Sequence, residues 1–113
     1  MKTIDVFEQY LAGQCTYYGV ERRGVLVKLT AESDAGNIRY TALVSFFPHT
    51  DDGDFAVSYD AMAEETLYDA KGRRSKKRDE ALLKELPAAA DRLAQSLGGA
   101  IDWENPLREA RYG

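Results

Sequence analysis

The chain has 113 residues, of which 44% are hydrophobic and 30% charged, and this is the composition of one globular domain, residues 1–113, rather than of a disordered chain. Its formal net charge of -4 argues against a function that requires binding to nucleic-acid phosphates over a broad surface. No segment approaches the ~18 uninterrupted apolar residues of a membrane span, and the opening segment MKTIDVFEQYLAG lacks the apolar core of a signal peptide, so we expect no membrane partner and a cytoplasmic location.

The first predicted element is a helix over about residues 3–12. Thr3 can cap its start, and Gly13 supplies a stop just past its end. The apolar residues between them fall at helical spacing: Val6, Phe7, Tyr10 and Leu11. The sequence therefore predicts an amphipathic N-terminal helix.

The pattern then changes to β-branched, aromatic and alternating residues, which predicts an antiparallel meander of three to five strands. The strand segments are GVLVKLT, NIRYTALVSFF and DFAVSYDAMA, and the turn-rich segments AESDAGN and PHTDDGD separate them. ETLYD either extends the third strand or forms a fourth, and TYYGVERRG either adds a strand or pairs as a hairpin. One face of the middle strand is continuously apolar: Ile38, Tyr40, Ala42, Val44 and Phe46.

From Ser75 the helical period returns, and the Gly98-Gly99 pair ends it. The apolar stripe consists of Leu82, Leu86, Ala89 or Ala90, Leu93 and Leu97. Pro87 predicts either a kink or a second helix that begins there. The predicted fold is thus α+β, in the order α-β-β-β(-β)-α, with both helices packed on one face of the sheet. Trp103 is expected to dock the following segment, and residues 104–113 are expected to fray.

The charges are unevenly distributed along the chain. A basic cluster consists of Lys71, Arg73, Arg74, Lys76, Lys77 and Arg78. The acidic block that precedes it consists of Asp51, Asp52, Asp54, Asp60, Glu64, Glu65 and Asp69. Adjacent blocks of opposite charge largely cancel within a Debye length of about 8–10 Å, so the plain interpretation is a self-neutralising surface. The alternative interpretation is a phosphate site, because cations at a helix start are unfavourable unless an anion lies nearby.

GRRSKK followed by a long helix resembles the junction between the last strand and the second helix of double-stranded-RNA-binding domains. The predicted order of helix, strands and helix is similar as well. The resemblance implies that Lys76 and Lys77 contact phosphates and that Glu8, on the first helix, contacts the minor groove. Nucleic-acid binding through the basic cluster is accordingly the alternative function.

Residues that carry catalytic or metal chemistry are scarce. Cys15 and His49 are each the single residue of their type, so we expect no metal site, no cofactor and no internal disulfide. The DDGD segment at 51–54 does not fit a calcium-binding EF-hand loop, because Pro48 would be its first residue. We therefore expect a protein that is not an enzyme, with a Cys15-dependent activity as the remaining catalytic hypothesis.

The leading functional hypothesis is a small acidic protein that binds a protein partner, as an inhibitor, immunity-type, anti-defence or adaptor protein. Phe46, Phe55 and Tyr40 are expected in the core, whereas an exposed apolar patch would suit a partner. The partner-contacting candidates are Asp51, Asp52, Asp54, Asp60, Glu64, Glu65, Tyr17, Tyr18 and Phe47. Both a monomer and a homodimer remain open.

Overall fold

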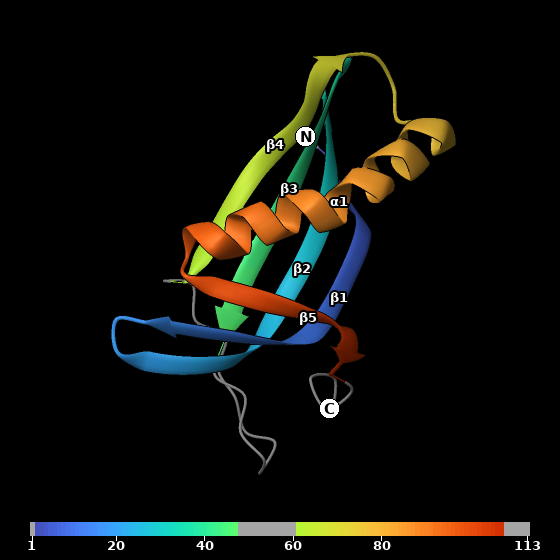
Figure 1. Ribbon diagram of the computed structural model, residues 1–113. Helices are drawn as coiled ribbons and strands as arrows, with labels where there is room; N and C mark the ends of the chain where they lie inside the picture. Colours follow the sequence, from blue (N-terminus) through green and yellow to red (C-terminus); the bar gives the residue numbers. More distant parts are fainter. Residues whose placement is uncertain (1, 48–60, 108–113) are drawn as a thin grey trace.

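A computed structural model describes residues 2–47 and 61–107 (Figure 1). The elements are β1 (Lys2–Tyr17), β2 (Val20–Asp34), β3 (Asn37–Phe47), β4 (Met62–Lys71), α1 (Lys76–Ser96) and β5 (Gly99–Pro106). The strands form one antiparallel sheet in the order β4-β3-β2-β1-β5, and α1 lies across one face of it. The predicted strands GVLVKLT and NIRYTALVSFF lie in β2 and β3, and ETLYD lies in β4, whereas most of the predicted strand DFAVSYDAMA lies outside the described residues. Within the described residues, however, the protein is mostly β with a single helix.

The predicted N-terminal helix is wrong, because residues 3–12 belong to β1. Phe7 faces Leu29 of β2, and Leu11 faces Val25. A spacing of four residues returns to the same face in a strand as well as in a helix, so these apolar pairs satisfy both periods. The register shifts between Asp5 and Phe7, and this irregularity further disguises the alternation. Pairing with neighbouring strands decides between the two structures.

Tight turns join the first three strands. Tyr18 and Gly19 connect β1 to β2, and Ala35 and Gly36 connect β2 to β3, all four with positive φ. Two consecutive residues of positive φ are the pattern of type I′ turns, whose twist matches that of a β-hairpin. The predicted turn segment AESDAGN thus contains a real turn.

The helix α1 begins and packs as the sequence predicts. The Ser75 hydroxyl accepts a hydrogen bond from the Arg78 backbone N–H at 3.1 Å and caps the helix. The buried residues of α1 are Leu82, Leu86, Ala89, Ala90, Leu93 and Ala94. Pro87 is exposed inside one continuous helix, so the alternative of a second helix that begins at Pro87 is wrong.

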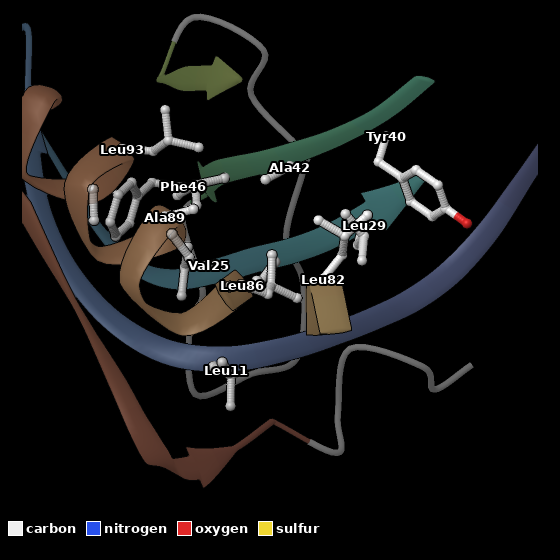
Figure 2. Packing of buried hydrophobic residues seen from close by; sticks show 14 of the residues in the cluster. Leu11, Val25, Leu29, Tyr40, Ala42, Phe46, Leu82, Leu86, Ala89 and Leu93 are labelled. Atoms are coloured by element: carbon white, nitrogen blue, oxygen red, sulfur yellow. The ribbon is translucent and has the colours of Figure 1, made fainter. Parts of the chain in front are cut away.

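The core lies between α1 and the inner face of the sheet. The predicted stripe of β3, from Ile38 to Phe46, is at most 1% exposed. Figure 2 shows Leu82, Leu86, Ala89 and Leu93 of α1 interleaved with side chains of β2 and β3. These contacts fix the position of α1 on the sheet.

The strand β5 has no counterpart among the predicted elements. It follows α1 and pairs with β1, so that Ala12 faces Asp102 and Cys15 faces Gly99. Trp103 docks this segment as expected, because its indole Nε1–H donates to the Asp91 carboxylate at 2.9 Å. Residues 104–106 belong to β5, whereas 108–113 lie outside the described residues. In the part of the chain that the structure describes, no helix combines the length and the apolar character of a membrane crossing.

Candidate binding surfaces

The basic cluster surrounds the connection from β4 to α1. Lys71 ends β4, Arg73 and Arg74 lie in the connection, and residues 76–78 form the first turn of α1. The Gly72 N–H donates to the Gly36 carbonyl at 2.9 Å, which ties the connection to the turn between β2 and β3. The whole cluster therefore lies at one end of the sheet, the upper end in Figure 1.

Asp79 anchors the first turn of α1 to the sheet. Its carboxylate accepts a hydrogen bond from the Tyr40 hydroxyl, and it pairs with Arg74 Nε at 3.0 Å. An acidic residue in the first turn also compensates the helix dipole. Tyr40 and Asp79 are 39 residues apart, so no local pattern in the sequence points to this contact.

Tyr40 is completely buried, and burial raises its pKa to about 12, with the hydrogen bond to Asp79 and the negative charge of Asp79 adding to the effect. The unfolded chain loses this proton near the usual value of 10, so the folded chain alone keeps it between pH 10 and about 12. We expect a stabilisation that is fully present below pH 10 and is lost toward pH 12, by up to about 1.4 kcal/mol per pH unit.

Urea unfolding of the wild type and of Tyr40→Phe across this pH window measures the effect. The difference in unfolding free energy between the two proteins should shrink as the pH rises, because the variant has no phenol at this position. A difference that is independent of pH would contradict the assignment.

Two of the arginines in the basic cluster are engaged within the protein. Arg74 pairs with Asp79, as described above. The Arg78 guanidinium lies 4.5 Å from the centroid of the Tyr68 ring, and its Nη1 donates to the Arg73 carbonyl at 3.2 Å. The other side chains are exposed and form no ion pair within the described residues: Lys71, Arg73, Lys76 and Lys77. Among the described members of the acidic block, Glu65 pairs with Arg92 and Asp69 pairs with Arg39, so these two carboxylates do not neutralise the basic cluster.

A groove of about 340 Å³ adjoins Lys77 and Arg78 of this cluster, and we call it the β4–α1 groove. It is lined by Tyr68, Ser75, Lys77, Arg78, Ala81 and Leu82. Ala81 is exposed, whereas Leu82 is 6% exposed and belongs to the core. The groove therefore combines an apolar wall with a cationic rim.

The sheet face opposite α1, which we call the open face, is acidic. No described element covers it over β2, β3 and β4 away from Phe47. Its charged residues in the described strands are Asp5, Glu8, Glu32, Asp34, Glu64 and Asp69 against Lys28, Arg39 and Lys71. Two of these cations are already paired, Lys28 with Asp5 and Glu8, and Arg39 with Asp69. The face therefore keeps an excess of negative charge.

Apolar side chains interrupt these charges on the open face. Leu26 and Leu43 are half-buried, and Met62 is 38% exposed. Glu64 lies directly opposite Leu43 on the neighbouring strand. Glu65 points to the other face, where it pairs with Arg92 of α1 at 2.7 Å. Of the two adjacent glutamates, only Glu64 is thus a candidate for a contact on the open face.

The aromatic candidates do not form one patch. Tyr18 is 83% exposed at the turn between β1 and β2, where its ring packs on that of half-buried Tyr17 at 4.6 Å. Phe47, expected on an exposed face, is completely buried: its ring covers Gly24 and lies 5.9 Å from that of Tyr10. Tyr40 and Phe46 lie in the core as predicted.

Several candidates of the acidic block lie outside the described residues: Asp51, Asp52, Asp54 and Asp60. The same holds for His49 and Phe55. Glu8 is described, but it lies on the strand β1 and contacts Lys28. Because the predicted first helix is a strand, the helix, strands and helix order of double-stranded-RNA-binding domains is not present in residues 2–47 and 61–107.

Cys15 is buried beside β5, and its thiol donates to the Leu97 carbonyl at 3.4 Å. Burial raises the pKa of this thiol, and the nearby positive charge of Arg22 partly opposes the effect. The reactive thiolate is therefore disfavoured. Across the two described ranges, no three His, Cys, Asp or Glu side chains lie close enough to hold a metal ion.

A larger groove, of about 470 Å³, lies over the paired segments of β1 and β5, beside the start of β2. Gly13 and Ile101 line it, and Arg23 and Glu21 on its rim pair with each other at 2.8 Å. Because these charges compensate each other, the groove gives less indication of a ligand than the β4–α1 groove does.

Comparison of the chain with family models, with curated proteins and with solved structures gives no match. Its function is therefore inferred from the surfaces described above.

Proposed function

We propose that the protein is a non-catalytic binding protein whose open face docks on a basic surface of a protein partner. The observation that carries this proposal is the combination of excess carboxylates with half-buried apolar side chains on one face of a sheet. Apolar contacts supply affinity in such an interface, whereas complementary charge guides encounter and fixes orientation.

The rigidity of the face supports the same proposal. Each strand beneath it is packed on its other side against the core, so the carboxylates stand on a preorganised surface. An inhibitor, immunity-type, anti-defence or adaptor role fits this mode of action. The expected cytoplasmic location belongs to this proposal too.

A charge reversal on the open face tests it. We expect Glu64→Lys to weaken partner binding about tenfold, because it replaces attraction by repulsion on the open face. Glu80→Lys is the matched control, since Glu80 is exposed on α1 and the change in net charge is the same.

Proteins retained from a cell lysate by the wild type and by Glu80→Lys, but not by Glu64→Lys, would be purified and titrated calorimetrically against all three proteins. The proposal predicts a basic partner with the stated order of affinities. Equal affinity for the two variants, or the lack of any partner that binds saturably in purified form, would refute it.

A further inference from the structure

The β4–α1 groove lies on a different surface from the open face. Its apolar wall consists of Ala81 and Leu82, and its volume of about 340 Å³ falls in the lower part of the range of ligand pockets, about 300–1,000 Å³. Tyr68 closes one side of it, and the Arg78 guanidinium lies over that ring. The groove is thus formed by residues of β4, of α1 and of the connection between them.

The cations around the groove are not needed to stabilise the helix. The N-cap is already provided by Ser75, and Asp79 compensates the dipole in the first turn. Lys76 and Lys77 are exposed, and like charges on consecutive residues raise the local positive potential. An anion near this rim would therefore gain attraction without competing with an internal ion pair.

We propose that the β4–α1 groove binds a short acidic segment of a partner protein, which places one apolar side chain against Ala81 and Leu82 and its carboxylates against Lys76 and Lys77. The complementarity is twofold, because the groove offers an apolar wall and a cationic rim side by side. Such a site makes the protein bivalent, with a negative docking face and a positive docking groove.

A short peptide fits better than a nucleic-acid duplex. A duplex carries charge along its whole length and would extend past the cluster toward Asp69 and Glu80. A short segment instead confines its charges to a Debye length of about 8–10 Å around the cations. In addition, Arg78 already covers a face of the Tyr68 ring on which a base could stack.

The test uses fluorescently labelled synthetic peptides with Glu residues on both sides of a central Phe, and a second peptide with Ser in place of Phe. Binding to the full chain is followed by fluorescence anisotropy at low and at physiological salt. We expect the Phe peptide to bind about tenfold more tightly than the Ser peptide, and both to weaken as salt rises.

Two variants locate the binding. Lys77→Glu should weaken the Phe peptide about tenfold, because Lys77 lines the groove. Arg23→Glu makes the same change in charge on an exposed side chain of β2, near the opposite end of the sheet, and should leave the affinity unchanged. Thermal melting of both variants verifies that they are folded.

Other outcomes would overturn the proposal. These are no binding to the wild type at low salt, equal affinity for the Phe and Ser peptides, or the same loss in Lys77→Glu and Arg23→Glu. Tighter binding of a duplex RNA, lost in Lys77→Glu, would replace the peptide by nucleic acid as the occupant. The proposed role of the open face would stand in each case, because none of these residues lies on it.

Discussion

Replacing Phe46 with Ala is expected to lower the free energy of unfolding by about 3–5 kcal/mol. Phe46 is completely buried on β3, and its ring lies against Gly13 of β1 and Gly99 of β5. Removal of the ring leaves a cavity at the point where three strands and α1 meet, and the glycines around it have no side chains that could fill the space.

Urea unfolding of Phe46→Ala, with Phe7→Ala as the matched control, measures this effect. Phe7 is half-buried on β1, so the same chemical change there should cost less. If Phe46→Ala is too unstable to purify, Phe46→Leu preserves the test with a smaller cavity. Equal losses at Phe46 and Phe7 would contradict the assignment of Phe46 to the centre of the core.

Gly99→Ala is expected to cost about 1–3 kcal/mol through overpacking. A Cβ at Gly99 would lie 2.7 Å from the Phe46 ring, 2.9 Å from Cys15 Cβ and 2.9 Å from the Gln14 carbonyl oxygen. The last contact is with backbone, so a simple change of rotamer cannot relieve the overlap. Strand β5 must shift away from β1 to admit even one methyl group.

The neighbouring Gly98 provides the control. It has a φ of +76°, and no atom lies within 4 Å of the place that a Cβ would take there, so Gly98→Ala strains the backbone without a clash. Both variants should lower the free energy of unfolding, but only Gly99→Ala should change the NMR shifts of amides in β1 and β5 that pair with each other. Unchanged shifts in Gly99→Ala would show that β5 does not pack closely on Phe46.

These residues also show what the sequence alone can predict. The alternation of β3 from Ile38 to Phe46 has a single interpretation, and so does the long stripe of α1 after its Ser75 cap. The spacing of Phe7 and Leu11 fits both a helix and a strand. Which of the two forms depends on pairing with residues that lie far away in the sequence. β5 has eight residues, and the short alternation of Ile101 and Trp103 with polar residues does not indicate which strand it pairs with.

Among the candidate surfaces, too, features that are local in sequence could be predicted, whereas features that depend on distant residues could not. The basic cluster is local in sequence, and its place around the start of α1 could be predicted. The contact of Tyr40 with Asp79 joins residues of β3 and α1, and the groove beside Tyr68 depends on how β4 packs against α1. Neither could be predicted, because both arise from tertiary packing.

The strand order has a consequence for synthesis of the chain on the ribosome. β1 is the first described strand to emerge, yet it lies between β2 and β5, and β5 emerges last. Until then the edge of β1 around Ala12 and Cys15 has no strand β5 to pair with. The Phe46 ring likewise lacks its packing contact with Gly99. Completion of the core must therefore wait for nearly the whole described chain, and the nascent protein carries an open strand edge that favours binding by chaperones or aggregation.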